Sequence, residues 1–176
     1  MDSEMLVLVN ESDAEVGQME KMETHQKGLL HRAFSVLLFT KHGDFLLHQR
    51  ALTKYHSGGL WTNACCGHPR PEENIALAAE RRLNEEMGIH TALSALFQFR
   101  YTATLSNQLV ENELDHVFTG ITEKKPCPDI LEVSDWKYVS YNALEHDLEQ
   151  KPERYTIWFQ LIFNHPEFKK WYKAQF

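Results

Sequence analysis

The sequence predicts a fold of the α/β or α+β class, in which helices form layers on a β-sheet. Short apolar runs of strand length recur from the N-terminal region to about residue 139. One amphipathic helical pattern interrupts them, and helical patterns fill the C-terminal part of the chain. Many strands and few helices, with the helices at only two places in the sequence, are typical of such layered folds.

The predicted strands are apolar runs that turn residues separate. AFSVLLFT is the strongest of them, and FLLHQR follows the turn KHGD as the return strand of a hairpin. The polar stretch ETHQKGLLHR before them is expected to be a loop, and LWTNACC is expected to be extended. Strands are expected at residues 5–9, 33–40, 45–50, 96–105, 110–119 and 136–139.

The helices are predicted from apolar spacing. Ile75, Ala79, Leu83 and Met87 form a stripe at i, i+4, and Gly88 is a natural C-terminal stop. The expected helices cover residues 73–87, 141–149, 152–163 and 166–174.

Length and charge limit the possible functions. A chain of 176 residues suits a single domain over 1–176, and its net charge of −7 argues against nonspecific nucleic-acid binding. An anionic ligand would need a local cluster of Lys and Arg or a bound cation. We expect no membrane partner, because no apolar run approaches the ~20 residues of a membrane helix.

The start of the chain and its cysteines favour a cytoplasmic protein. The segment MDSEMLVLVNE carries acids where a signal peptide has bases. Three cysteines form no disulfide framework, which is typical of a reduced compartment.

Two adjacent cysteines in WTNACCGHP raise the question of which sulfur is functional. Their Cα atoms lie ~3.8 Å apart, too close for ordinary disulfide geometry. In an extended segment, Cys66 shares a face with Thr62 and Ala64, and His68 joins that face if the extension continues. Cys65 points the other way. Cys66 is the better candidate for a site with His68, although burial of both cysteines as small apolar groups stays an open alternative.

The motif VENELDH places Glu111, Glu113 and Asp115 on one face of a predicted strand. Neighbouring carboxylates on that face are ~6.8 Å apart, so they repel unless water or a cation separates them. Taken alone, the motif favours a water-facing strand surface. A mixed imidazole and carboxylate site is the alternative if His25, His31 and His68 converge there, which their spacing does not show.

The most specific pattern is GHPRPEENIALAAERRLNEEMGI. It contains the series Gly67, Glu73, Arg81, Glu85, Glu86 and Gly88. This pattern resembles the Nudix box, a loop and helix that place acidic side chains on divalent cations bridging a diphosphate. One position departs from the box, because Arg82 stands where the family has a metal-binding glutamate. An arginine one turn before Glu86 can grip phosphate oxygens, so diphosphate binding is favoured over hydrolysis.

Several further segments narrow the resemblance. EKMETH, LLHRAFS, QRALTKY, LWTNACCGHP, RRLNEEMG, FRYTA, LVENELDHVF and YTIWF are similar, in this order, to segments of the type I isopentenyl-diphosphate isomerases, a branch of the Nudix superfamily. His25 and His31 lie slightly closer in sequence than in the family pattern, which leaves the geometry of their loop open. The resemblance implies an α/β/α sandwich around a mixed β-sheet.

The resemblance also implies an activity and its residues. The family interconverts isopentenyl and dimethylallyl diphosphate, a step of isoprenoid biosynthesis, by protonating the alkene and deprotonating its opposite face. Cys66 and Glu113 match the catalytic pair, and Cys65 matches no functional position. The residues matching substrate contacts are Lys21, Arg50, Lys54, Arg82, Tyr101 and Trp158.

Two cation sites follow from the same resemblance. Glu86 matches the ligand of a Mg²⁺ ion that binds with the substrate diphosphate. A second divalent ion, zinc, manganese or magnesium, would bind at His25, His31, His68, Glu111 and Glu113. The expected partner is a small isoprenoid diphosphate, and the protein is expected to be a monomer or homodimer. The alternatives are a Nudix pyrophosphohydrolase and a noncatalytic metal-binding module.

Overall fold

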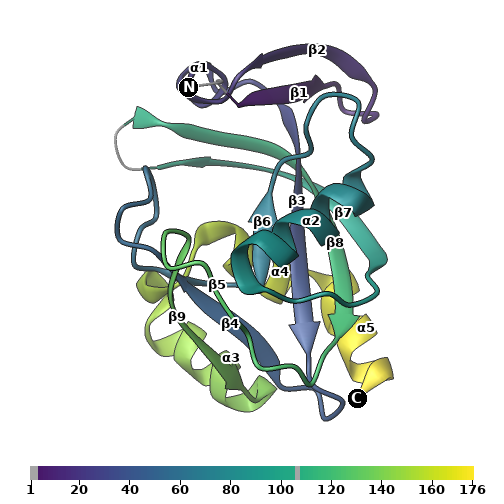
Figure 1. Cartoon of the computed structure of the whole chain (residues 1–176), viewed down its shortest axis with the longest axis vertical. Helices are drawn as coiled ribbons and strands as arrows, with labels where there is room; N and C mark the ends of the chain where they lie inside the picture. The colour runs from purple at the N-terminus through teal and green to yellow at the C-terminus, as the bar shows by residue number, and fades with distance from the viewer. Residues whose placement is uncertain (1–3, 106–107) are drawn as a thin grey trace.

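The computed structural model describes residues 4–105 and 108–176. Within these residues, nine strands form one mixed β-sheet (Figure 1). The strands are β1 (Met5–Val9), β2 (Glu15–Glu20), β3 (His31–Phe39), β4 (Phe45–Arg50), β5 (Trp61–Thr62), β6 (Cys65–Gly67), β7 (Ser94–Thr104), β8 (Val110–Ile121) and β9 (Val133–Val139). The helices are α1 (Lys21–Lys27), α2 (Ile75–Met87), α3 (Tyr141–Gln150), α4 (Ile157–Asn164) and α5 (Pro166–Gln175), with a short 3₁₀ turn at Pro152–Arg154.

Strand β3 is the centre of the sheet. Strand β8 pairs with it in parallel along its whole length, from His31 opposite Glu113 to Phe39 opposite Ile121. The other edge of β3 therefore holds its antiparallel partners β1, β6 and β4. The pairing of β3 with β4 confirms the predicted hairpin. Strands β6 and β8 thus lie on opposite edges of β3.

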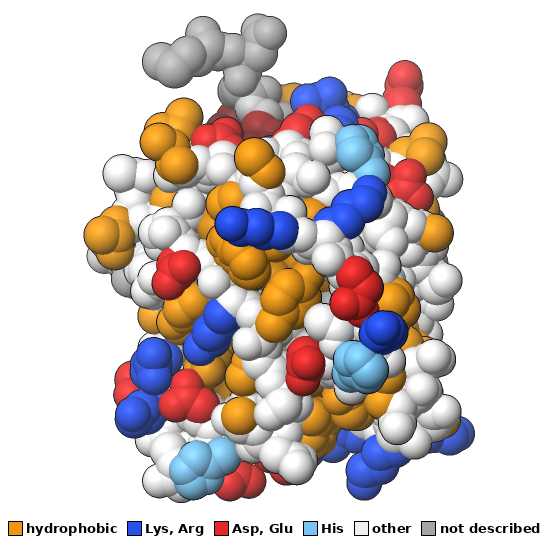
Figure 2. Space-filling model, turned by 60° about the horizontal axis from the view of Figure 1, so that its bottom comes forward, with side chains coloured by type: hydrophobic (Ala, Val, Ile, Leu, Met, Phe, Trp, Pro, Cys, Tyr) orange, Lys and Arg blue, Asp and Glu red, His pale blue; other side chains and the backbone are white. Residues whose placement is uncertain are grey.

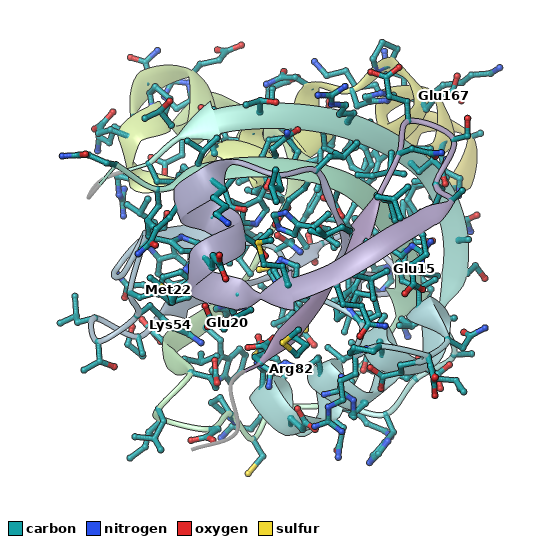
Figure 3. The ribbon with its side chains drawn as sticks, turned by 90° about the horizontal axis from the view of Figure 1, so that it is seen from above. Glu15, Glu20, Met22, Lys54, Arg82 and Glu167 are labelled. Atoms are coloured by element: carbon teal, nitrogen blue, oxygen red, sulfur yellow. The ribbon has the colours of Figure 1, made fainter. Side chains whose placement is uncertain are left out.

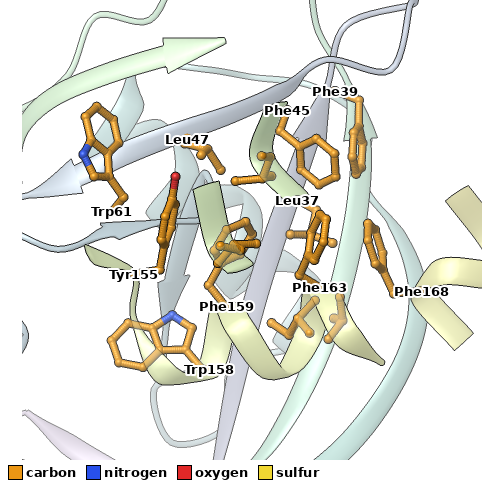
Figure 4. Packing of buried hydrophobic residues seen from close by; sticks show 14 of the residues in the cluster. Leu37, Phe39, Phe45, Leu47, Trp61, Tyr155, Trp158, Phe159, Phe163 and Phe168 are labelled. Atoms are coloured by element: carbon orange, nitrogen blue, oxygen red, sulfur yellow. The ribbon is translucent and has the colours of Figure 1, made fainter. Parts of the chain in front are cut away.

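Helices cover both faces of the sheet. Phe34, Val36 and Leu38 of β3 pack against the buried side of α2. The alternate residues Leu37 and Phe39 pack against α3, α4 and α5 in a second cluster, part of which is drawn in Figure 4. This alternation is the period of two that a strand buried on both faces requires. The predicted α/β/α sandwich is confirmed.

Helix α2 follows its predicted apolar stripe. It begins at Ile75 because the Asn74 side chain caps it, accepting hydrogen bonds from the backbone N–H groups of Ala76 and Leu77. Gly88 ends it in the left-handed conformation, at φ 64°, as the sequence predicts. The start is two positions later than the expected 73, since residues 73 and 74 belong to the cap.

An ion pair ties the loop after β6 to α2. Arg81 donates from Nε to Glu73 Oε1 at 2.7 Å and from Nη2 to Glu73 Oε2 at 2.8 Å. The backbone N–H of Arg70 donates to Glu73 Oε2 at 2.8 Å. Hydrogen bonding by Arg81 lowers the pKa of Glu73. These two residues of the Nudix-like pattern therefore fix the shape of the loop.

The prediction that residues 23–32 form a polar loop is wrong. Helix α1 occupies Lys21–Lys27, with Glu20 accepting from the backbone N–H of Glu23 and Gly28 closing the helix at φ 62°. Strand β3 then begins at His31, two residues before its expected start. The helix escaped detection because the side chains it buries, Thr24 and His25, are polar rather than apolar.

Two other predicted elements are interrupted. The stretch 60–66 is broken between β5 and β6, so Ala64 packs with Cys65 on the α2 side rather than with Cys66. The helix expected over 152–163 begins only at Ile157. The backbone N–H of Thr156 donates to Trp61 O at 3.0 Å, which holds the preceding residues in an extended bridge to β5.

The surface mixes charges of both signs. On the face in Figure 2, basic, acidic and hydrophobic side chains are interspersed. Across the described residues, no helix has the length and apolar character required to cross a membrane.

We predict that Glu73→Gln lowers the free energy of unfolding by about 1 kcal/mol at pH 7, a typical value for a partly exposed ion pair. Because the pKa of Glu73 is lowered in the fold from 4.5, its stabilisation is complete above pH 4.5 and is lost as the pH falls through the lower value. Urea unfolding at pH 7 and at pH 3.5 measures this, with the exposed Glu80→Gln as control. A difference from wild type that is equally large at both pH values would contradict it.

Candidate active site

A cavity of about 640 Å³ opens at the end of the sheet that α1 borders. Figure 3 looks down on this end and labels Lys54 and Arg82, both of which approach Glu132. Eleven of the predicted site residues line the cavity: Lys21, Arg50, Lys54, Cys66, His68, Arg82, Glu86, Tyr101, Glu111, Glu113 and Trp158. The two others, His25 and His31, are buried behind its wall.

The carboxylates of VENELDH lie inside the protein. Glu111, Glu113 and Asp115 are 2%, 8% and 1% exposed, so the interpretation of a water-facing surface is wrong. Side chains alternate between the two faces along β8, so these three carboxylates lie on one face, as predicted. Their burial requires positive charge or hydrogen-bond donors nearby, because a desolvated carboxylate without partners is costly.

Three elements bring histidines to these carboxylates. His31 opens β3 and His68 follows β6, and their Nε2 atoms lie 3.5 and 3.0 Å from Glu113 Oε1. His25 comes from α1, with Nε2 at 3.4 Å from Glu111 Oε2. One ligand atom from each of His25, His31, His68 and Glu113 lies within 4.8 Å of the others. The convergence that the sequence left open is therefore present.

The orientation of the rings fits a divalent metal ion. The Nδ1 atoms of His25 and His31 lie 2.7 and 2.8 Å from the backbone oxygens of Lys21 and Leu29. A carbonyl can only accept, so Nδ1 carries the proton and each Nε2 presents a lone pair to the cluster. Both Nε2 atoms and Glu111 Oε2 are buried without a hydrogen-bond partner. Lone pairs that converge in this way suit a cation.

The two glutamates differ in their surroundings. Burial would raise the pKa of Glu113, but hydrogen bonding by neighbouring imidazoles lowers it below its usual range. Burial and the neighbouring Glu113 raise the pKa of Glu111 well above its usual range. Burial likewise raises the pKa of Tyr101, whose hydroxyl donates to Glu113 Oε2 at 2.6 Å. Glu113 is thus held by Tyr101 on one oxygen and faces His68 Nε2 at 3.0 Å with the other.

The cysteines are separated by the strand pleat as predicted. Cys65 is fully buried in the cluster beneath α2, whereas Cys66 lines the cavity and packs toward the opposite cluster. Burial raises the pKa of Cys66 to about 12 even though Arg50 acts against it. The Cys66 sulfur is therefore a neutral thiol near pH 7. Cys65, Cys66 and Cys127 are all free.

Two predicted phosphate-binding residues share a carboxylate. The Lys54 ammonium group contacts Glu132, and Arg82 Nη2 lies 3.5 Å from the same side chain. Arg82 also contacts Glu86, which is buried at 4% exposure and whose pKa burial raises. Lys54 and Arg82 thus form one ion-pair network with Glu86 and Glu132 where the cavity meets α2. Glu132 also lines the cavity, and no sequence motif identified it.

The other two bases lie elsewhere on the cavity wall. Lys21 Nζ contacts Glu4 Oε2 at 2.8 Å. Arg50 Nη1 lies 3.8 Å from Cys66 Sγ, and its guanidinium carbon is 5.3 Å from the centre of the Trp158 ring. Trp158 belongs to the buried aromatic cluster (Figure 4) and also lines the cavity, where a substrate contact is expected from the sequence.

Sequence reasoning missed His56 and Tyr55. Both line the cavity from the loop between β4 and β5, and His56 Nε2 lies 3.2 Å from Glu111 Oε1. Burial lowers the pKa of His56 to about 3, so the ring is neutral near pH 7. No local periodicity marks this loop, and only the three-dimensional contact with Glu111 reveals these residues.

Comparisons with known proteins show what the chain is similar to. Residues 29–159 match the family described as NUDIX domain. The chain is 50% identical over 161 residues to isopentenyl-diphosphate Delta-isomerase 2 of Photorhabdus laumondii, covering 92% of this chain and 91% of that protein. It is 48% identical to isopentenyl-diphosphate Delta-isomerase 1 of Aromatoleum aromaticum, with 89% of each covered.

Solved structures share the fold at low sequence identity. A Deinococcus radiodurans protein superposes with a TM-score of 0.69 at 19% identity, covering 84% of this chain and 90% of that chain. The MutT protein of Methanosarcina mazei superposes with a TM-score of 0.63 at 20% identity, covering 83% of this chain and 94% of that chain.

We predict that Mn²⁺ or Zn²⁺ raises the melting temperature of the wild-type protein and that His31→Ala abolishes this effect. A cation at 100 times its Kd stabilises the folded state by about 2.7 kcal/mol, or roughly 5–10 °C for a chain of this size. Differential scanning fluorimetry after dialysis against a chelator measures the shift. The exposed His42→Ala should behave as wild type, and an undiminished shift in His31→Ala would refute the assignment.

Proposed function

Because this chain belongs to the Nudix family and, within it, to the isopentenyl-diphosphate Delta-isomerases, we propose that Cys66 and Glu113 move the two protons of its reaction. The reaction interconverts isopentenyl and dimethylallyl diphosphate by shifting one C=C bond, which supplies isoprenoid biosynthesis. The observation that carries the proposal is that the Cys66 thiol and the Glu113 carboxyl group line one cavity from opposite edges of β3.

The chemistry of the two groups suggests a role for each, because a thiol can donate a proton and a carboxylate can accept one. In the forward reaction, the Cys66 S–H bond breaks and its proton adds to the terminal CH₂ carbon of the alkene. The positive charge then lies on the tertiary carbon. The Glu113 carboxylate removes a proton from the carbon next to the diphosphate-bearing CH₂, and the electrons of that C–H bond form the new double bond. A proton returned from Glu113 to the thiolate through solvent restores the starting state.

The topology supports attack from two sides. Cys66 pairs with Ser35 on one edge of β3, and Glu113 pairs with His31 on the other edge. A small hydrocarbon tail lying across β3 would have the thiol on one side and the carboxylate on the other. Trp158 would stabilise the positive tertiary carbon by about 2 kcal/mol or more when desolvated. The Arg50 guanidinium already approaches the face of its indole ring.

The cluster of histidines and glutamates is proposed to hold one divalent ion. Its ligands would be His25, His31, His68, Glu111 and Glu113, a mixed set that accepts zinc, manganese or magnesium. His25, His31, His68 and Glu113 form one group of converging ligand atoms, and Glu111 forms a second with His25 and His56. When bound, the ion would fix the two carboxylates and favour their ionised forms. Tyr101 keeps its proton and its hydrogen bond to Glu113, which orients the carboxylate toward the cavity.

The charged end of the cavity is proposed to bind the diphosphate. Lys54 and Arg82 lie together there, and Lys21 and Arg50 extend the basic wall. Glu86 would share a Mg²⁺ ion with the phosphate oxygens, because magnesium binds through carboxylate and phosphate together. The contacts of Lys54 and Arg82 with Glu132 must give way to those with phosphate when substrate binds.

We predict that Cys66→Ala reduces turnover of isopentenyl diphosphate by about 10³-fold, within the range that a positioned acid or base contributes. The measurement is the initial rate of dimethylallyl diphosphate formation, followed by NMR. Cys65→Ala is the matched control, since that sulfur packs under α2 outside the cavity, and it should keep its turnover. Full activity in Cys66→Ala would remove the thiol from the mechanism.

A second assay separates isomerisation from hydrolysis. The wild-type protein is incubated with isopentenyl diphosphate and, separately, with a nucleoside diphosphate linked to a second group, while double-bond position and phosphate release are followed. We expect isomerisation without phosphate release, because Arg82 stands where hydrolysis would need a carboxylate. Phosphate release without isomerisation would make the protein a pyrophosphohydrolase.

A further inference from the structure

The loop between β4 and β5 carries His56, which lies between the proposed cation ligand Glu111 and the ring of Trp158. His56 is 6% exposed. Its ring packs edge-on against Tyr55 and Trp158, with centroids 4.3 and 5.9 Å apart. A side chain in a surface loop is normally solvated, so such burial indicates that its position is built into the site.

The two oxygens of Glu111 have different neighbours. Oε1 lies 3.2 Å from His56 Nε2. Oε2 lies 3.4 Å from His25 Nε2 and has no hydrogen-bond partner. The carboxylate is therefore directed to His56 by one oxygen and to the proposed cation by the other.

The second nitrogen of His56 has a partner that permits the required tautomer. Nδ1 lies 3.2 Å from the hydroxyl oxygen of Ser57. A hydroxyl can donate to Nδ1, which leaves the ring proton on Nε2, facing a carboxylate that accepts once a bound cation keeps it ionised. This matches the arrangement in which a partner outside the ligand set holds a metal-binding side chain in place.

We propose that His56 is a positioning residue that donates from Nε2 to Glu111 Oε1 and thereby presents Oε2 to the divalent ion, without being a ligand itself. The inference rests on the proposed function, because it assigns a role within the same cation site. His56 also links the cation site to the proposed diphosphate-binding residues, since Arg50 Nη2 donates to the His56 backbone oxygen at 3.3 Å.

The test compares His56→Gln, His56→Leu and the exposed control Thr53→Ala in the same loop. Gln places an N–H donor close to the position of Nε2, whereas Leu keeps bulk without a donor. Mn²⁺ affinity is measured by competition with a chelator, and the absorption of bound Co²⁺ reports the number of ligands. We expect His56→Leu to weaken Mn²⁺ binding about 10–100-fold. His56→Gln should recover most of that loss, with the Co²⁺ spectrum unchanged.

A double-mutant cycle with Glu111→Gln tests whether His56 acts through Glu111. The loss of affinity caused by His56→Leu should shrink when Glu111 is already replaced. Wild-type affinity in His56→Leu would overturn the inference, as would an undiminished loss in the Glu111→Gln background. A Co²⁺ spectrum that loses one ligand in His56→Gln would also overturn it and make His56 a direct ligand. Failure of the wild-type protein to bind either ion would instead refute the proposed cation site.

Discussion

The burial of two glutamates on one face of β8 is the constraint on which the rest of the site depends. Glu111 and Glu113 are 2% and 8% exposed, and like charges at such depth are tolerated only with compensating partners. The parallel register of β3 and β8 sets His31 directly opposite Glu113. Helix α1 adds His25, and the end of β6 adds His68. Four separate segments thus meet at the carboxylates.

One face of the sheet serves as both core and site. Along β3 and β8, Leu37 and Val117 lie in the aromatic cluster under α3, α4 and α5. Two positions earlier on the same face, the Ser35 hydroxyl donates to Asp115 Oδ2 at 2.8 Å, and burial raises the pKa of Asp115 well above its usual range. Glu113, the proposed base, lies two positions further toward the start of β8. The hydrocarbon end of the proposed substrate would therefore meet a rigid apolar floor, while its diphosphate meets the basic wall near α2.

The sequence predicted those parts of the structure that follow a regular period. The apolar stripe of α2 and the shared face of Glu111 and Glu113 depend only on helical and strand geometry. Helix α1 was missed because its buried side chains are Thr24 and His25, which no hydrophobic pattern reveals. The predicted position of Ala64 on the same face as Cys66 was wrong because the chain bends between β5 and β6, where contacts distant in sequence decide the path.

The resemblance to known isomerases supplied the site residues, and the structure brings them to one cavity. It could not supply His56, since that assignment depends on contacts of a loop with β8 and α4. Nor could composition explain anion binding by a chain of net charge −7. The cavity wall holds six Lys and Arg side chains among six Glu side chains, so the proposed anion binding depends on these local bases together with bound cations.

The most direct test of this account is a crystal structure with Mn²⁺, Mg²⁺ and an unreactive isoprenoid diphosphate analogue, with Mn²⁺ located by anomalous diffraction. The account predicts a Mn²⁺ ion bonded to the Nε2 atoms of His25, His31 and His68, and a hydrocarbon tail between Cys66 Sγ and the Glu113 carboxylate. A Mn²⁺ ion bound away from these histidines, or a tail with both groups on the same side, would contradict it.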